Sequence, residues 1–368
     1  MTQNPYLLLT PGPLSTTAAV KEAMLRDWCT WDSDYSDLVE RMREELVSLA
    51  VENEGSRAAY TAVPMQGSGT YGVESVIGSV LPRDGRLLVI SNGAYGRRAA
   101  QTAAVLKINA VELSYRETER PDAADVAEML DEYPDVTHVL MTHCETTTGI
   151  LNDVESVGRI VKRLDKIFIV DAMSSFGGVP FDMEELGVDF MISSANKCIQ
   201  GVPGFSFIIA KKEELEKCRG RARSLSLDLF DQWDVMERGH GKWRFTSPTH
   251  VVRAFIEALA ELRGEGGVAA RNHRYSENQR RLASGMAKAG FYPLLVRELQ
   301  SPIITSFLYP EDRKFVFKEF YDFMKTEGYV IYPGKISEAE TFRIGSIGDV
   351  YPDQMDEVTA AAERYMKI

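Results

Sequence analysis

The chain has 368 residues, of which 44% are hydrophobic and 26% are charged, and these ordinary globular values exclude disordered, collagen-like and coiled-coil classes. Its 42 basic and 54 acidic residues give a net charge of −12, so we expect neither a nucleic-acid-binding nor a membrane-surface protein. At about 150 residues per domain, the length suggests two or three domains, or one large α/β domain with a smaller one.

The first twenty residues carry no charged side chain, but they do not read as a signal peptide. They lack a basic start, and Pro5, Pro11 and Pro13 interrupt any apolar helix. No other segment approaches the roughly 18 to 20 apolar residues of a membrane span. We therefore expect a soluble, cytoplasmic protein. The four cysteines form no CxxC pair and the histidines no pair at metal-ligand spacing, so neither a disulfide framework nor a metal site is expected.

Between residues 59 and 210, short apolar runs alternate with amphipathic stretches of helical length, which is typical of parallel βαβ units. Because the apolar runs do not alternate strictly with polar residues, we expect a sheet that is covered on both faces. The predicted strands are Ala59–Val63, Arg86–Ile90, Asn109–Leu113, Thr137–Thr142, Lys166–Val170, Val188–Ile192 and Phe205–Ala210. The predicted helices between them are Thr70–Val80, Tyr95–Leu106, Asp122–Leu130 and Val154–Leu164.

The pattern changes after a predicted helix at His250–Leu262, which is followed by Gly264, Gly266 and Gly267, placed like a hinge. Beyond the glycines we expect a smaller α+β domain. Its predicted elements are a long helix, Ile303–Leu308, a helix at Asp312–Thr326, Tyr329–Tyr332, Thr341–Ser346 and a closing helix. The predicted boundaries are a large domain at 15–263, with residues 1–14 contributing to its site, and a small domain at 264–368.

A glycine-rich turn follows the first predicted strand. Gly67-Ser-Gly-Thr-Tyr-Gly72 matches the GxGxxG dinucleotide fingerprint, but the acidic residue expected about 20 positions later is missing. Small residues before a helix still leave backbone N–H groups and the Ser68 and Thr70 hydroxyls free to face an anion. A plain glycine-rich turn with a threonine cap explains the pattern equally well.

Two ionisable residues end neighbouring strands at the edge where open α/β sheets bind ligands. Asp171 closes the strand that begins at Lys166, although a structural or helix-capping aspartate would also fit there. Lys197 follows the next strand and is the only charged residue between Ser193 and Gly204. A lysine held in such a place can lose its proton and attack an aldehyde.

A phosphate-binding turn, a carboxylate and a lysine, in this order along one sheet edge, predict a pyridoxal 5′-phosphate site. In that interpretation Lys197 binds the cofactor aldehyde, Asp171 keeps the ring nitrogen protonated, and the turn holds the phosphate.

Motifs along the whole chain carry a family resemblance. The sequence resembles the fold-type I, class-V pyridoxal phosphate aminotransferases, in the branch that holds alanine–glyoxylate and serine–pyruvate aminotransferases. The resemblance implies a mostly parallel seven-stranded sheet in a large domain, with a smaller α+β C-terminal domain. The stretches that carry it are Leu9-Thr-Pro-Gly-Pro-Leu14, Asp27-Trp-Cys-Thr-Trp-Asp32, Gln66-Gly-Ser-Gly-Thr70, Asn92-Gly-Ala-Tyr-Gly-Arg97, His143-Cys-Glu-Thr-Thr-Thr-Gly149, Val170-Asp-Ala-Met-Ser-Ser175, Ser194-Ala-Asn-Lys-Cys-Ile-Gln-Gly201, Phe245-Thr-Ser-Pro248 and Phe342-Arg-Ile-Gly345.

The resemblance also implies roles for residues that spacing alone leaves open. Tyr95 would stack on the cofactor ring and Thr146 would bind the ring hydroxyl. Gly69 belongs to the phosphate turn with Ser68 and Thr70. Asn196 and Thr246 would reach the cofactor phosphate, Thr246 from a neighbouring subunit, which implies a homodimer with shared sites. From the residues alone, Tyr95 could equally be a core aromatic, and the two threonines loop residues.

Two further residues would face the substrate by the same resemblance. Arg343 would bind an anionic group bidentately, although an arginine on a surface strand is the simpler interpretation. Gly12 would let the N-terminal segment close over the substrate, although a rigid surface turn would also explain it.

The implied activity moves the amino group of 2-aminoethylphosphonate to pyruvate, giving phosphonoacetaldehyde and L-alanine. The stretches around Lys197 and Trp28 favour these substrates. Transamination of alanine or serine with glyoxylate or pyruvate remains the alternative within the family. A nicotinamide-dependent dehydrogenase is a remote alternative that depends on GxGxxG alone.

Overall fold

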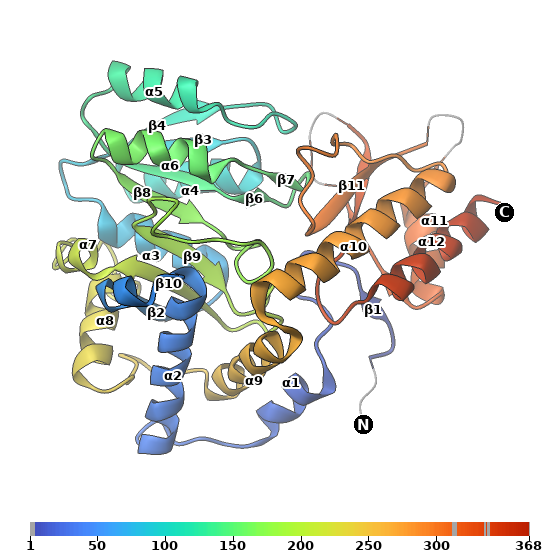
Figure 1. The fold of residues 1–368 in the computed structure, drawn as a ribbon. Coiled ribbons are helices and arrows are strands. Elements are labelled where there is room, and N and C mark those ends of the chain that lie inside the picture. Colours follow the sequence, from blue (N-terminus) through green and yellow to red (C-terminus); the bar gives the residue numbers. More distant parts are fainter. Residues whose placement is uncertain (1–3, 311–314, 335, 337–338, 368) are drawn as a thin grey trace.

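The computed structural model describes residues 4–310, 315–334, 336 and 339–367. Its centre is a seven-stranded sheet with the order β2-β10-β9-β8-β5-β3-β4 (Figure 1). These strands are β2 Tyr60–Gln66, β3 Arg86–Ser91, β4 Asn109–Ser114, β5 Val136–Thr142, β8 Ile167–Asp171, β9 Phe190–Ser194 and β10 Phe205–Lys211. All seven strands predicted between residues 59 and 210 are therefore present, with ends that differ by at most three residues.

The sheet is mostly parallel, as predicted. The five strands from β9 to β4 run parallel to their neighbours, whereas β10 pairs antiparallel with both β9 and β2. The edge strand β4 is exposed or half-buried along its length, so the expectation of a fully covered sheet is wrong at this edge.

Helices cover both faces because successive residues of the inner strands point to opposite sides. In β3, Leu88 and Ile90 join one core, whereas Leu87 and Val89 join the other. The first core packs against α2 Ser33–Ala50, α5 Ala123–Glu132, α6 Val154–Arg163 and α9 Thr249–Glu265. The second packs against α3 Gly69–Val80, α4 Ala94–Val105, α7 Lys212–Glu216 and α8 Leu229–Arg238.

The chain leaves this part of the molecule through two long helices. Helix α9 ends at Glu265, and Gly266 adopts a left-handed φ of 108° before α10 Gly267–Lys288 begins. The break therefore lies at Gly266, whereas Gly264 lies inside α9. In Figure 1, α10 runs from the sheet toward the C-terminal elements.

The C-terminal part is built around a three-stranded antiparallel sheet with the order β11-β14-β13 and a third hydrophobic core. The N-terminal segment belongs to this core, because Leu9 is buried in it and β1 pairs with β12. The elements are β1 Leu7–Leu8, β11 Ile304–Leu308, α11 Phe317–Thr326, β12 Tyr329–Val330, β13 Tyr332–Pro333, β14 Thr341–Gly345 and α12 Pro352–Met366. The boundary at residues 263 and 264 stays a prediction.

Several elements differ from the prediction. The single strand expected at Tyr329–Tyr332 is two short strands in different sheets, and the start of the helix expected from Asp312 lies outside the described residues. Helices α1, α2, α7 and α8 were not predicted, although Val39, Met42 and Leu46 of α2 have helical spacing. The remaining short elements are α1 Ala18–Glu22, a 3₁₀ helix at Ala23–Leu25, another at Glu54–Ala59, β6 Cys144–Glu145 and β7 Ile150–Leu151.

Among the described residues, no helix combines the length and the apolar character that crossing a membrane would require.

Candidate active site

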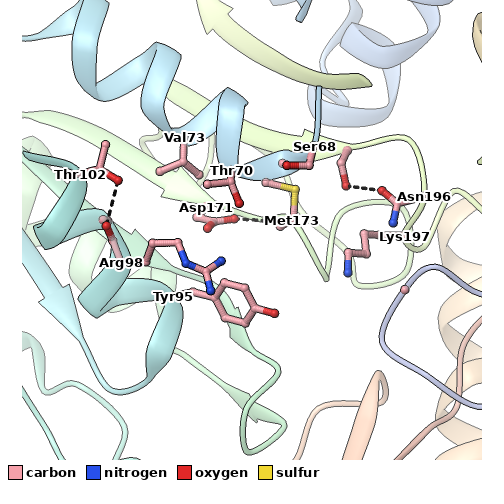
Figure 2. Close-up of a pocket in the computed structure, with 14 residues that line it drawn as sticks. Ser68, Thr70, Val73, Tyr95, Arg98, Thr102, Asp171, Met173, Asn196 and Lys197 are labelled. Atoms are coloured by element: carbon pink, nitrogen blue, oxygen red, sulfur yellow. Dashed lines mark hydrogen bonds between the residues drawn. The ribbon is translucent and has the colours of Figure 1, made fainter. Parts of the chain in front are cut away.

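The two ionisable residues singled out in the sequence meet at one edge of the sheet. Asp171 is the last residue of β8, where it pairs with Thr142 of β5 and Ile192 of β9, and Lys197 follows β9. This edge holds a cavity of about 240 Å³, shown in Figure 2. Eight of the predicted site residues line it, namely Gly12, Ser68, Gly69, Thr70, Tyr95, Asp171, Asn196 and Lys197.

Lys197 extends into the cavity beside the N-terminal segment (Figure 2). Its Nζ donates a hydrogen bond of 2.8 Å to the carbonyl of Pro11. Burial lowers the pKa of Lys197 to about 8, although the charge of Asp171 acts in the opposite direction. An appreciable fraction of this amine is therefore neutral near physiological pH, which is the form that attacks an aldehyde or accepts a proton.

Gly12 lies against this lysine. A Cβ atom at position 12 would lie 2.8 Å from Lys197 Nζ, and the backbone φ of 119° is one that side chains disfavour. The positive φ therefore favours glycine at this position, and any side chain would also displace the end of Lys197.

Asp171 is buried and has few partners. Its Oδ1 accepts a 3.0 Å hydrogen bond from the Met173 backbone N–H. Burial raises the pKa of Asp171 to about 6, although the Met173 hydrogen bond and the charges of Lys197 and Arg98 lower it. The carboxylate makes no ion pair within the described part of the chain, so it can receive a cationic group that enters the cavity.

The glycine-rich turn brings the start of α3 to the cavity wall. Ser68 is the N-cap residue, yet its side chain makes no capping hydrogen bond in the described structure. The Tyr71 N–H donates to the Ser68 carbonyl at 2.9 Å, whereas the N–H groups at the very start of a helix have no partner inside it. A Cβ atom at Gly69 would lie 2.3 Å from the Met173 sulfur, so a larger residue there would displace the Met173 side chain. The turn thus presents hydroxyl and amide donors to an anion.

Helix α4 contributes one face to the cavity. Tyr95, Arg98, Ala99 and Thr102 line it at the spacing of a single helical face. The Arg98 guanidinium lies 5.2 Å from the centre of the Tyr95 ring (Figure 2). This arrangement places an aromatic ring and a cation at the cavity, both from the first two turns of the helix.

Arg343 and Thr146 do not line this cavity but contact each other next to it. Arg343 lies on β14, the central strand of the small sheet, and is 4% exposed, so the surface-strand interpretation is wrong. Its Nη1 donates to the Thr146 carbonyl at 2.9 Å and its Nε to the Pro333 carbonyl at 3.0 Å. The Thr146 hydroxyl is buried and has no hydrogen bond of ordinary geometry to any described residue.

Thr246 lies apart from the cavity of its own chain. It is exposed in the segment between α8 and α9, and its carbonyl accepts a hydrogen bond from the side chain of Gln66. Gln66 directly precedes the glycine-rich turn, but Thr246 itself does not line the cavity.

Two charged residues of the site were not predicted. Arg98 was one position outside the quoted motif, and its i+3 spacing from Tyr95 was the available signal. Glu145 is buried and accepts hydrogen bonds from the Tyr95 N–H at 3.0 Å and the Thr147 hydroxyl at 2.8 Å. Burial raises the pKa of Glu145. No pattern in the sequence distinguished its carboxyl from an ordinary loop acid.

Comparison with known proteins identifies the class that this fold and site define. Residues 40–316 match the class-V aminotransferase family. In its fold the chain is similar to ureidoglycine–glyoxylate aminotransferase from Bacillus subtilis, with a TM-score of 0.89 and 21% identity, covering 100% of this chain and 94% of that one. The chain belongs to the class-V aminotransferases, which are fold-type I enzymes that depend on pyridoxal 5′-phosphate.

Sequence relatives narrow the similarity further. The chain is 59% identical over 364 residues to a 2-aminoethylphosphonate–pyruvate transaminase from Syntrophobacter fumaroxidans, covering 99% of this chain and 97% of the relative. It is also 59% identical to the enzyme of the same name from Bacillus cytotoxicus, over 97% of each chain.

The chemistry of the cavity fits the family's cofactor. A phosphate can accept from the hydroxyl and amide donors at the start of α3, a pyridine ring nitrogen can meet Asp171, and an aldehyde can react with Lys197. The buried Thr146 hydroxyl, which lies next to Tyr95, provides a further polar group.

Proposed function

We propose that this protein transfers the amino group of 2-aminoethylphosphonate to pyruvate, giving phosphonoacetaldehyde and L-alanine. The observation that carries the proposal is the meeting of Asp171, Lys197 and the α3 turn at one cavity of a class-V fold. The choice of substrates is supported by relatives of 59% identity that bear this name and align over almost the whole chain.

In this proposal, two residues do the chemistry. Pyridoxal phosphate, when bound, supplies an aldehyde that links to amines and a ring that stores electrons. Lys197 holds the cofactor and, once the substrate amine replaces it, accepts the proton from the substrate carbon. A pKa of about 8 suits a base that works near neutral pH. Asp171 holds a proton on the ring nitrogen by charge and hydrogen bonding.

The other residues bind and orient. Ser68, Gly69, Thr70 and Asn196 hold the phosphate at the positive end of α3. Tyr95 covers the ring, and Thr146 binds the ring hydroxyl.

Arg343 and Gly12 act on the substrates and not on the cofactor. Arg343 donates to the phosphonate of one substrate and the carboxylate of the other, because a guanidinium can pair with two oxygens of either anion. Gly12 lets the N-terminal segment lie close to Lys197 and exclude water.

The proposal includes a homodimer in which Thr246 completes the phosphate site of the partner. It is supported by the exposure of Thr246 outside its own cavity and by nearby exposed aromatic side chains. Trp31 is 83% exposed and its ring lies next to Lys242. Phe245 is 47% exposed and lines the same surface cavity as Thr246. Sedimentation of the purified protein as a monomer at micromolar concentration would contradict this part.

We also propose the cytoplasm as its compartment. In the described structure the four cysteines are free thiols, as is usual in reducing compartments. Recovery of the native protein in the periplasmic or membrane fraction would contradict it.

The test of the proposed function has two parts. Purified protein should absorb visible light through its bound cofactor, and Lys197→Ala should abolish that band. The wild type should then convert 2-aminoethylphosphonate and pyruvate much faster than serine or alanine with glyoxylate. Comparable or faster turnover of the second pair would replace the proposed substrates by those of the alternative.

A further inference from the structure

The turn that follows Lys197 has an unusual backbone. The Gln200 N–H closes it with a 2.7 Å hydrogen bond to the Lys197 carbonyl, and Gln200 adopts a positive φ of 69° although it is not glycine. A Cβ atom at Gly201 would lie 2.7 Å from the Ala195 carbonyl oxygen. Such a conformation persists only when its surroundings hold it in place.

Helix α10 supplies that support through Arg271. This arginine is 1% exposed, and its Nη1 donates to the carbonyls of Cys198 at 2.9 Å and Ile199 at 3.3 Å. These are the two residues directly after Lys197. Its Nη2 pairs with Glu265 at 2.7 Å, which offsets the charge of a guanidinium that is otherwise excluded from water.

Arg274, one helical turn further along, uses the same carboxylate. Its Nε pairs with Glu265 at 2.7 Å, and its Nη2 donates to the Gln200 side chain at 2.9 Å. The Tyr275 hydroxyl donates to the same Gln200 oxygen at 2.7 Å. The strained residue of the turn is therefore held by its side chain as well as by its neighbours.

Arg274 also reaches the other half of the site. Its Nη1 donates to the carbonyls of Gly348 at 2.9 Å and Val350 at 2.7 Å. These carbonyls belong to the loop that follows β14, the strand that carries Arg343. Glu265, Arg271 and Arg274, here called the arginine clamp, thus join the lysine turn to the loop beyond the substrate arginine.

We propose that the arginine clamp positions Lys197 relative to Arg343, so that the base and the anion-binding group keep one distance through the reaction. The clamp residues act through the turn and the loop and are positioning residues. This inference rests on the proposed function, because it assumes that Lys197 and Arg343 serve one reaction.

A positioning role of Arg271 and a purely structural role predict different results when Arg271 is replaced. Without Arg271, the Ile199 carbonyl loses the guanidinium as its donor and the Cys198 carbonyl keeps only the Tyr275 hydroxyl at 3.3 Å. The turn can then relax toward a less strained form that moves Lys197 away from Asp171. The environment of the lysine then changes even if the fold is stable. If α10 served only to hold the fold together, stability would fall while the lysine kept its environment.

The experiment compares Arg271→Lys and Tyr275→Phe with Arg281→Lys in the holoenzyme. Arg281 lies on the same helix and pairs with Glu277, Asp353 and Asp356, so it is a matched control outside the clamp. Three quantities are measured: the pH midpoint of the visible absorbance, kcat and KM separately, and hydrogen exchange of residues 195–202 in the cofactor-free protein.

For Arg271→Lys we expect kcat to fall by about tenfold, the pH midpoint to move by about half a unit, and exchange of the turn to accelerate. Tyr275→Phe, which removes a single hydroxyl, should change the same three quantities less. Arg281→Lys should leave all three at their wild-type values.

The proposal would be overturned if the folded Arg271→Lys and Tyr275→Phe variants had the same pH midpoint, kcat and exchange as Arg281→Lys. If Arg271→Lys does not fold, Tyr275→Phe decides by the same criteria. Failure of the proposed function would look different, because the wild type itself would then lack the visible band or the transaminase activity.

Discussion

The cofactor cavity contains a buried carboxylate and the arginine clamp a half-buried one, and the pKa values of the two carboxylates shift in opposite directions. In the cavity, burial raises the pKa of Asp171 to about 6. In the clamp, burial also raises the pKa of Glu265, but the hydrogen bonds and charges of Arg274 and Arg271 outweigh it and leave the pKa below its usual value. The clamp carboxylate is paired with two arginines, whereas Asp171 makes no ion pair with any described residue.

The difference between a paired and an unpaired carboxylate distinguishes a structural ion pair from a binding site. Structural ion pairs satisfy each other, and a buried charge without a partner weakens the fold unless something else binds it. Burial also disfavours the charged form of Lys197, and it therefore lowers the pKa of this amine to about 8. Because both residues line one cavity, they are suited to a group that offers a cation to Asp171 and an aldehyde to Lys197.

Asp171→Asn should give the largest change in activity. The amide keeps the shape of the carboxyl but cannot hold a proton on the cofactor ring, so we expect kcat to fall by roughly 10²- to 10⁴-fold. Steady-state assays with 2-aminoethylphosphonate and pyruvate measure it. Activity within a factor of about three of the wild type would show that Asp171 has no electronic role.

Glu265→Gln should give the largest loss of stability. It leaves the buried Arg271 without a counter-charge, and we expect the free energy of unfolding to fall by about 3 kcal/mol, measured by urea unfolding. Glu277→Gln is the matched control, because Glu277 also pairs with two arginines of α10, at 2.7 and 2.8 Å, but these arginines are solvent-exposed or half-exposed. It should not change stability measurably. If both variants lost the same free energy of unfolding, Glu265 would contribute no more to stability than a carboxylate in a surface ion pair.

The stability of cofactor-free Asp171→Asn should differ from that of the wild type in a pH-dependent way. A folded-state pKa of about 6, against 3.8 when unfolded, means that the folded wild type binds its proton more tightly. The wild type therefore loses stability relative to the variant as pH rises from about 4 to 6, and the difference levels off above that at roughly 3 kcal/mol or less. Urea unfolding of both proteins at several pH values between about 4 and about 7, a range that brackets this transition, measures it. A constant difference across this range would show that the buried carboxyl does not titrate as inferred.

Sequence reasoning succeeded where a single local pattern carried the information. The apolar strands, the glycine turn before α3, and the placement of Asp171 and Lys197 at strand ends all follow from patterns within about ten residues. For the edge strand β4, the same pattern gave no sign that the sheet ends there. The sequence around Arg343 likewise did not indicate that its strand is the central one of the small sheet.

Contacts between distant segments could not be predicted. Arg271 meets Cys198 across 73 residues, and the arginine meets its carbonyls only because α10 crosses the molecule after the break at Gly266. Glu145 is similar, since its burial and its hydrogen bond from the Tyr95 N–H depend on the packing of two segments that are 50 residues apart. Such groups look like ordinary surface charges until the topology is known.

Arg343→Lys should have the smallest of these effects and tests the boundary between the two regions, because Arg343 belongs to the small sheet yet faces the cavity side. The guanidinium already donates to Thr146 through Nη1 and to Pro333 through Nε, and no described residue accepts from Nη2. A lysine ammonium cannot keep both carbonyl contacts and also present a planar pair of donors to an anion. We therefore expect KM for both substrates to rise by about tenfold, with the visible absorbance and its pH midpoint unchanged. If kcat falls instead while KM is preserved, Arg343 acts on the position of Lys197, and the anion must be bound by another cation of the cavity, for which Arg98 is placed.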